Sequence, residues 1–269
     1  MKLQVQGHAA YAYTGGPAFD ASRPGVVFVH GALNDHSVWT LLARWLAHHG
    51  HAVLAVDLPG HGRSEGPPLP DVEATADWLL ALLDAAGVAQ AALVGHSMGS
   101  LIALEAAARA PARITRLVMV GSAYPMKVSE ALLATAREQP LLAIDRVNAF
   151  SMSTWASKPS YPGPGAWVHG GNRALMRRIQ AQATQRLGLN LFAHDFAVCD
   201  RYAGGLEAAA RVACPASLIL GSRDQMTPPR AAAGLATALK ARVTTLACGH
   251  ALMAEAPDAT LAALRTALG

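Results

Sequence analysis

The sequence predicts an α/β fold in which helices flank a mostly parallel, twisted sheet that carries a helical lid insertion. Six short apolar runs end in Gly, Asp, Ser or His, at 25–31, 52–60, 91–97, 114–122, 216–224 and 242–250. Amphipathic stretches separate most of these runs, which is typical of repeated βα units around a parallel sheet. The alternation fails once, between Ser122 and about Val212, where we expect the insertion.

The remaining core elements follow the same alternation. LQVQ and AAYAYT, at 3–6 and 9–14, predict a hairpin of antiparallel edge strands. Helix patterns lie at 36–50, 71–87 and 99–111 before the insertion, and at 229–240 and 257–269 after it. Gly50 and Gly87 stand where helix C-terminal caps belong, and Pro111 closes a third helix.

The insertion is predicted to be a helical cap over residues 124–211, between core segments 1–123 and 212–269. Its basic stretch RALMRRIQAQATQR, at 173–186, predicts a helix with Met176 and Ile179 on the inner face and its arginines outside. Inserted segments of this length usually cover the site. Candidates to line an apolar pocket, rather than an ordinary small core, are Met126, Phe150, Met152, Trp155, Tyr161 and Trp167.

Composition excludes several classes of protein. With 269 residues, 52% hydrophobic and 15% charged, the chain is too apolar to be disordered. No apolar run reaches the roughly 18 residues of a spanning helix, and the amino terminus lacks a signal-peptide pattern, so we expect a cytoplasmic protein without a membrane partner. The abundance of Arg and Ala is typical of high-GC bacteria. Three scattered cysteines, Cys199, Cys214 and Cys248, indicate neither a disulfide framework nor a zinc site.

The net charge of +4 comes entirely from the insertion, where ten Lys or Arg stand against six Asp or Glu. A dense basic stripe interleaved with aromatic residues is absent from the sequence, so no nucleic-acid partner is expected. His48, His49 and His51 crowd a helix end without an acidic residue at metal-site spacing, and we interpret them as surface residues. The sequence therefore predicts no metal.

The motif GHSMG, at 95–99, fits G-x-S-x-G directly after a predicted strand and directly before a predicted helix. Glycines on both sides of Ser97 allow a tight turn that leaves its hydroxyl exposed at the tip. A serine hydroxyl needs a base to take its proton and a carboxylate to orient that base. His250 follows the last predicted strand and Asp224 the strand before it, so both belong to the same edge of the sheet as Ser97.

Backbone amides must stabilise the oxyanion that such a serine would create. One predicted donor is the N–H of Met98, at the start of the helix after the turn. The second belongs to the loop HGALND, where Ala32 is the main candidate and Leu33 the weaker one; Leu33 is also a candidate for substrate contact. His30 is interpreted as structural, and Gly31 makes room for the approach of the substrate.

These motifs resemble the α/β-hydrolase superfamily, within it the serine hydrolases that include carboxylesterases, pimeloyl-ester esterases and meta-cleavage C–C hydrolases. The resemblance covers HG near residue 30, DLPGHGRS at 57–64, GHSMG, GSRDQMTP and the terminal GH. The chain order Ser97, Asp224, His250 is similar to that family's nucleophile, acid and histidine. In DLPGHGRS we interpret Asp57, His61 and Ser64 as structural loop residues.

The resemblance implies a cofactor-free hydrolase, monomeric or homodimeric, that cleaves a small-molecule ester of a small or medium carboxylic acid through an acyl-enzyme. A rival interpretation is C–C bond hydrolysis of a dienone acid, for which Arg173, Arg177 or Arg178 could hold a carboxylate. A rival from another class is a ligand receptor that keeps a slow triad on this fold. An arginine pointing into the pocket would favour C–C hydrolysis, and micromolar binding with almost no turnover would favour the receptor.

Overall fold

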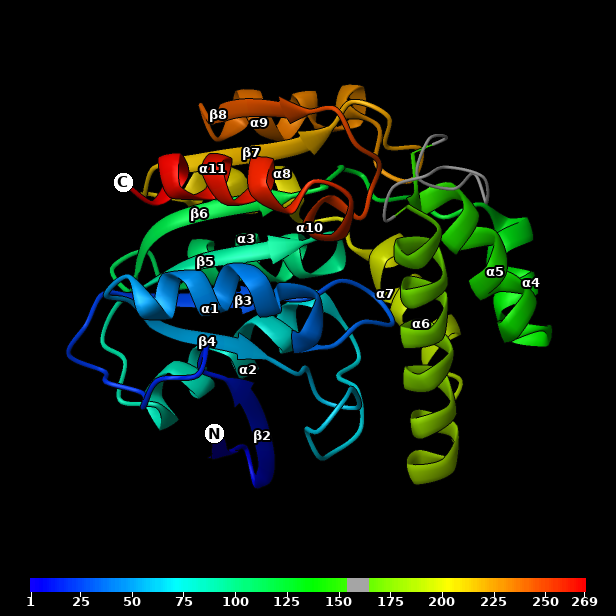
Figure 1. Cartoon of the computed structure of the whole chain (residues 1–269), viewed down its shortest axis with the longest axis horizontal. Coiled ribbons are helices and arrows are strands. Elements are labelled where there is room, and N and C mark those ends of the chain that lie inside the picture. The colour runs from blue at the N-terminus through cyan, green and yellow to red at the C-terminus, as the bar shows by residue number, and fades with distance from the viewer. Residues whose placement is uncertain (154–164) are drawn as a thin grey trace.

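The protein is built on one eight-stranded sheet in the order β1-β2-β4-β3-β5-β6-β7-β8, as a computed structural model of residues 1–153 and 165–269 shows (Figure 1). β2 pairs antiparallel with β1 and β4, and every other pair is parallel. The predicted α/β fold is confirmed. The strands are β1 Lys2–Val5, β2 His8–Tyr13, β3 Gly25–Val29, β4 Ala52–Val56, β5 Ala91–His96, β6 Ile114–Val120, β7 Ala216–Gly221 and β8 Arg242–Leu246.

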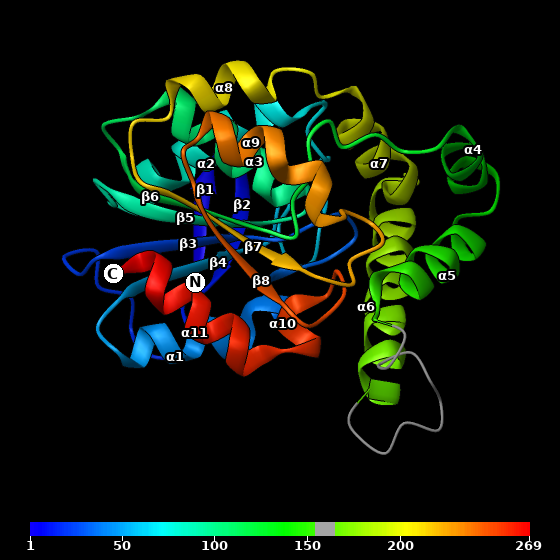
Figure 2. The same ribbon diagram turned by 90° about the horizontal axis from the view of Figure 1, so that it is seen from above.

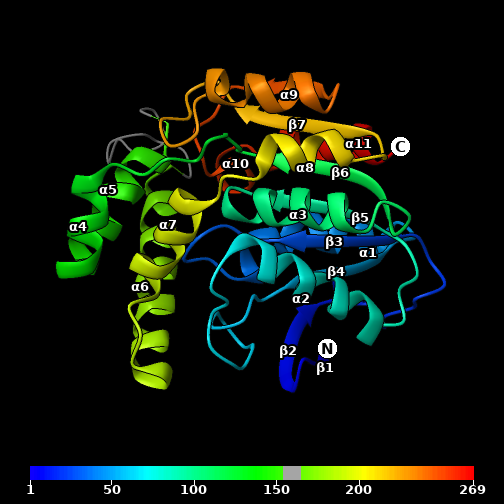
Figure 3. The same cartoon turned by 180° about the vertical axis from the view of Figure 1, so that it is seen from behind.

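Helices cover both faces of the sheet, as the view from above shows (Figure 2). One face carries η1 His36–Trp39, α1 Thr40–His48, α10 Leu252–Glu255 and α11 Pro257–Leu268. The other carries α2 Val72–Ala85, α3 Met98–Arg109, α8 Gly205–Arg211, η2 Pro229–Ala232 and α9 Ala233–Ala238 (Figure 3). The five helix patterns predicted outside the insertion all match these elements to within two residues at each end.

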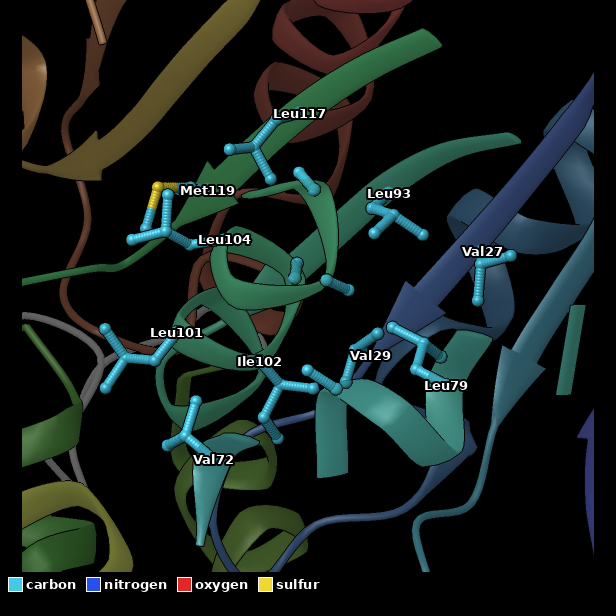
Figure 4. Close-up of a cluster of buried hydrophobic side chains, with 14 of the residues drawn as sticks. Val27, Val29, Val72, Leu79, Leu93, Leu101, Ile102, Leu104, Leu117 and Met119 are labelled. Atoms are coloured by element: carbon cyan, nitrogen blue, oxygen red, sulfur yellow. The ribbon is translucent and has the colours of Figure 1, made fainter. Parts of the chain in front are cut away.

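Alternation along the strands divides the core into two layers. In β3, Val27 and Val29 pack toward α2 and α3, while Val26 and Phe28 pack toward α1. Figure 4 shows side chains of the first layer, which come from β3, β5 and β6 and from α2 and α3. Because β3, β4 and β5 are buried along their whole length, their side chains are apolar on both faces, which explains the continuous apolar runs of the sequence.

The ends of the helices follow local chemistry. The side chain of Asp71 accepts a hydrogen bond from the N–H of Ala74 and so caps α2. Gly50 and Gly87 have φ of 92° and 68°, in the left-handed region that ends a helix most easily in glycine. The C-terminal caps predicted at these two positions are confirmed.

Four further helices stand beyond the carboxyl ends of the parallel strands: α4 Glu130–Glu138, α5 Pro140–Ser151, α6 Gly165–Leu187 and α7 Leu191–Arg201 (Figure 1). They share a small apolar core that includes Ile144, Met176 and Phe192. The predicted helix 173–186 begins earlier, at Gly165, and contains Gly170 and Gly171. Each glycine costs about 1 kcal/mol relative to alanine in a helix, so the packing of α6 against α5 and α7 outweighs local propensity.

Helix α8 lies inside the predicted insertion but packs against α3 and α9 on a face of the sheet. We therefore propose that the cap ends near Arg201, about ten residues before the limit of 211 expected from the sequence. Within the part of the chain that the structure describes, no helix combines the length and apolarity needed to span a membrane.

Candidate active site

The turn between β5 and α3 holds Ser97 in a strained backbone conformation. Its φ of 52° and ψ of −121° are unusual for a residue with a side chain. The N–H of Ser97 donates to the carbonyl of Val120 on the neighbouring strand, and its own carbonyl accepts from Ser100. These bonds fix the turn between sheet and helix, and strain of this kind persists only where the surroundings impose it.

Two glycines of the motif are needed because a side chain at either position would clash with the backbone. A Cβ on Gly95 would lie 2.1 Å from the carbonyl oxygen of Gly99, and one on Gly99 would lie 2.4 Å from that of Val29. The start of α3 therefore packs against β5 and β3 more closely than alanine would allow. A Cβ on Gly31 would lie 3.1 Å from the Cβ of Ser97, so the loop after β3 passes directly beside the serine.

His250 reaches this edge of the sheet from the loop after β8. Its Nδ1 lies 2.8 Å from Oδ2 of Asp224, which sits in the loop after β7. The same oxygen accepts a 2.7 Å hydrogen bond from Oγ1 of Thr227, while Oδ1 accepts the N–H groups of Met226 and Thr227. Although burial alone would raise the pKa of Asp224, the charge and hydrogen bond of His250 hold that pKa well below its usual range. Asp224 therefore stays ionised and fixes the proton of His250 on Nδ1.

The cap holds the backbone of His250. The carbonyl of Ser151, at the end of α5, accepts from the N–H groups of His250 and Ala251 at 2.7 and 3.3 Å. On the other side, His96 donates from Nε2 to the carbonyl of His250 at 2.9 Å. Burial, followed by the neighbouring His250, lowers the pKa of His96 to about 3, so His96 is neutral.

Ser97 and His250 line one cavity of about 50 Å³ beneath the cap. In the described residues no hydrogen bond joins the two side chains, and such bonds often tighten only when substrate binds. Ala32 lines the same cavity, and Met98 is the first residue of α3. Across residues 1–153 and 165–269, neither Ala32 N–H nor Met98 N–H donates to a protein acceptor. In that part of the chain these two donors are therefore without a protein partner.

A larger groove of about 290 Å³ adjoins this cavity. The two share the lining residues Asn34, His96, Asn172 and Ala251. Apolar side chains from η1, α1, α6 and α10 make up much of the groove wall: Val38, Leu41, Val168, Leu175 and Met253. The arrangement offers a reacting serine at one end and an apolar compartment at the other.

Comparison with known proteins identifies the family to which this fold belongs. A family profile described as the alpha/beta hydrolase fold matches residues 24–166, which is more than half of the chain. This chain belongs to the α/β-hydrolase family. Its relatives include proteins named as esterases, lipases and an epoxide hydrolase.

Relatives of this hydrolase include the pimeloyl-[acyl-carrier protein] methyl ester esterase of Aromatoleum aromaticum, 32% identical over 260 residues, which covers 88% of this chain and 95% of the relative. The enol-lactonase from Burkholderia xenovorans has a TM-score of 0.83 at 24% identity, covering 100% of this chain and 99% of that one. The hydrolase spans only 26% of the acetoin-cleaving dihydrolipoyllysine-residue acetyltransferase component of Pseudomonas putida, at 39% identity over 99 residues or 36% of this chain. A diacylglycerol lipase of Mus musculus is 37% identical over 102 residues, a match that covers 38% of this chain and 33% of the lipase.

Of the lid residues predicted to line the pocket of this hydrolase, those that the structure describes are not among the residues that line the cavity or the groove. Trp167 is 85% exposed and Phe150 is 53% exposed, whereas Met126 and Met152 are buried outside both linings. Trp155 and Tyr161 lie outside the described residues. The cap and a core loop instead supply side chains that the sequence did not single out for the pocket: Val147, Asn172, Met176, Phe196 and Met226.

Leu33 does not serve the role expected of it either. Its side chain is fully buried against the cap core, and its N–H donates to Oδ2 of Asp195 at 2.9 Å. Because that donor is already used, Leu33 is corrected from a candidate oxyanion donor and substrate contact to a residue that joins the loop to the cap. Ala32 keeps the role predicted for it as a proposal.

The three cap arginines of this hydrolase point to carboxylates. Arg173 and Arg177 both bind Asp145 on α5, and Arg178 donates to Asp35 in the core at 2.7 Å. None of the three is among the described residues that line the cavity. Among the described residues, none of these three arginines therefore points inward, the arrangement that would favour C–C hydrolysis of a dienone acid.

One cluster has the composition of a metal site. Ligand atoms of Asp35, His36 and Asp57 lie within 4.8 Å of one another. These atoms already bind protein groups: Asp57 accepts from the N–H and Nδ1 of His36 and from the N–H of Arg63, and Asp35 binds Ser37 and Arg178. We interpret the cluster as the support of the loop after β4.

Proposed function

We propose that this hydrolase cleaves carboxylic esters of small or medium acids through an acyl-enzyme on Ser97, without a cofactor or metal. The observation that carries the proposal is the pair of His250 and Asp224 beside the cavity that Ser97 lines. Because Asp224 occupies Nδ1 of His250, Nε2 is the nitrogen that can take a proton from the serine.

In this mechanism Oγ of Ser97 attacks the ester carbonyl carbon while its proton moves to Nε2 of His250. The tetrahedral intermediate collapses when His250 returns that proton to the leaving alcohol. Water then attacks the acyl-enzyme by the same steps in reverse and releases the acid. Throughout, Asp224 stabilises the imidazolium form of His250.

The N–H groups of Ala32 and Met98 would bind the oxyanion of the intermediate. The described residues offer neither N–H group a protein acceptor, which supports this role, as does the position of Met98 at the positive end of the dipole of α3. One preorganised donor of this kind is worth about 10²- to 10³-fold in turnover.

The adjoining groove supports an apolar group on the substrate. At roughly 30 Å³ per heavy atom, the share of a water molecule in the liquid, its volume of about 290 Å³ accommodates on the order of ten non-hydrogen atoms. Relatives covering most of this chain are named methyl ester esterases, so methyl esters of medium-chain acids belong among the first substrates to test. No observation on the described residues favours C–C hydrolysis, and measured turnover of an ester would decide against a receptor.

Labelling with a fluorophosphonate, followed by peptide mass spectrometry, tests the proposal. The parent protein should carry the label on Ser97, and Ser97→Ala should remain unlabelled and lose roughly 10⁴- to 10⁶-fold in turnover of an activated ester. Label on another residue, or undiminished turnover of the variant, would refute the assignment. Micromolar binding of esters with no turnover above the variant would identify a receptor.

A further inference from the structure

One carboxylate of the cap reaches the loop that carries the proposed oxyanion donor. Asp195, on α7, is 2% exposed, and its Oδ2 accepts hydrogen bonds from the N–H of Leu33 and from Nε2 of His61, each at 2.9 Å. Leu33 directly follows Ala32, the donor proposed above. A residue of the cap therefore holds the peptide group next to the oxyanion site.

The backbone at Leu33 needs such an anchor. Its φ of 52° lies in the left-handed region, which is unfavourable for a residue with a branched side chain. A strained conformation persists only where the surroundings impose it. Two features impose it at Leu33. Its N–H is bound to Asp195, and its side chain is fully buried among Ile144, Phe192 and other cap residues. Without that bond the loop can relax, and the direction of the Ala32 N–H changes with it.

His61 compensates the charge of Asp195. Both ring nitrogens of His61 face acceptors, because Nδ1 lies 3.0 Å from the carbonyl of Pro59 and Nε2 faces the carboxylate. Burial alone would lower the pKa of His61, but the Asp195 carboxylate raises it; burial alone would raise the pKa of Asp195, but His61 lowers it. The pair is an imidazolium bound to a carboxylate. Its charges balance, so Asp195 does not repel a nearby oxyanion as a lone carboxylate would.

A second histidine holds the same loop from the core side. His30 donates from Nδ1 to the carbonyl of Gly31 at 2.8 Å and accepts the N–H of Leu58 on Nε2 at 3.1 Å. Burial, followed by the charge of neighbouring His61, lowers the pKa of His30 to about 4, so His30 is neutral. The loop is thus fixed on one side by a neutral histidine of the core and on the other by a carboxylate of the cap.

We propose that Asp195, together with His61, is a positioning residue that sets the oxyanion loop and makes turnover depend on the docked cap. The proposal rests on the proposed function, since it requires Ser97 to pass through an oxyanion. Asp195 acts on the Leu33 peptide and does not contact the substrate. Its effect should therefore appear in the stabilisation of the intermediate and leave substrate binding nearly unchanged.

Asp195→Ala is the main test, with Asp145→Ala as the matched control. Asp145 is also a cap carboxylate bound to cations, Arg173 and Arg177, and among the described residues none of its hydrogen bonds reaches the oxyanion loop. Both variants are measured as KM and as kcat per active site, with the sites counted by complete fluorophosphonate labelling, so that misfolded protein does not contribute. The third readout is inhibition by a trifluoromethyl ketone, whose adduct with a serine carries an oxyanion.

We expect Asp195→Ala, which removes the acceptor of the Leu33 N–H, to lose about 10- to 100-fold in kcat, within the range of one lost oxyanion donor, with KM within threefold. The trifluoromethyl ketone should weaken in parallel, and Asp145→Ala should keep all three values within threefold. If Asp195→Ala does not fold, His61→Gln is measured instead with the same expectation, because it leaves the carboxylate of Asp195 without a compensating charge.

A folded variant with kcat and ketone affinity within threefold of the parent would overturn the positioning role while leaving ester hydrolysis intact. A rise in KM with unchanged kcat would overturn it as well, because the residue would then act on binding. Failure of the parent protein to label on Ser97 would instead contradict the proposed function. The two failures are therefore distinguishable.

Discussion

Replacing Asp224 by asparagine tests the triad through the tautomer of His250. The side-chain oxygens of Asp224 have different partners: Oδ1 accepts two backbone N–H groups, from Met226 and Thr227, and Oδ2 accepts from His250 and from the hydroxyl of Thr227. An asparagine must place its carbonyl oxygen toward the two backbone donors, since neither can rotate away. Its NH₂ group then faces Nδ1 of His250.

An NH₂ group in that position donates to Nδ1, so the imidazole proton moves to Nε2. Nε2 can then no longer accept the proton of Ser97. In serine proteases this wrong tautomer costs about 10⁴-fold in kcat, which corresponds to about 5 kcal/mol of activation free energy. We expect the same order of loss for Asp224→Asn, with little change in KM because none of these groups binds the substrate.

Thr227→Val is the matched control. It removes the 2.7 Å hydrogen bond to Oδ2 of Asp224 and the 3.1 Å contact of Oγ1 with Nδ1 of His250, but it leaves the carboxylate that holds the proton of His250 on Nδ1. We expect a stability loss of about 1 kcal/mol and a kcat within tenfold of the parent. Steady-state hydrolysis of a p-nitrophenyl ester measures both variants. A loss below tenfold in Asp224→Asn, or equal losses in the two variants, would refute the assignment of Asp224.

Three further predictions concern pH and the groove. The folded-state pKa of His96, about 3, lies below its unfolded value of about 6.5, so between these two pH values the unfolded chain binds more protons than the folded one. The free energy of unfolding therefore falls as the pH drops below about 6.5. Urea unfolding of His96→Asn should show a dependence of this free energy on pH that is shallower by about 1 kcal/mol per pH unit, and an unchanged dependence would contradict this. Leu175→Trp should fill the groove and lower kcat/KM for medium-chain esters more than tenfold while acetate esters stay within threefold; a uniform effect would show that the acyl chain lies elsewhere. Trp167→Ala should leave the chain-length profile unchanged, because that side chain is 85% exposed; a shift would place it in the substrate path.

The parts of the fold that follow from local pattern were predictable. Each of the six strands is a short apolar run that ends at a turn residue, and each occurs where the pattern predicts it. The motif GHSMG combines a strand, a tight turn and a helix within a few residues, so its consequence for Ser97 follows from backbone sterics alone. Asp224 and His250 were locatable because carboxyl ends of neighbouring parallel strands meet at one edge of the sheet.

Pocket-lining residues of the cap were not predictable in the same way. Trp167 and Met176 are both large and apolar, but they are nine positions apart on α6, which at 100° per residue places them on opposite faces. Met176 faces inward and is 4% exposed, whereas Trp167 faces solvent. The sequence did not show that these two residues share one helix, because the Gly-Gly pair at 170–171 argues against a helix there. Only the packing of the cap stabilises that helix.

Asp195 shows why the link between the cap and the oxyanion loop leaves no mark in the sequence. The first of the two aspartates in LFAHDFAVCD is most economically interpreted as a solvated position on a helix, since burying a lone carboxylate is strongly unfavourable. It is buried here because His61, 134 positions earlier, and the N–H of Leu33, 162 positions earlier, converge on one of its oxygens. No short-range sequence pattern links these three groups. Only the docking of α7 onto the carboxyl edge of the sheet brings them together, and the same docking closes the cavity over Ser97 and His250.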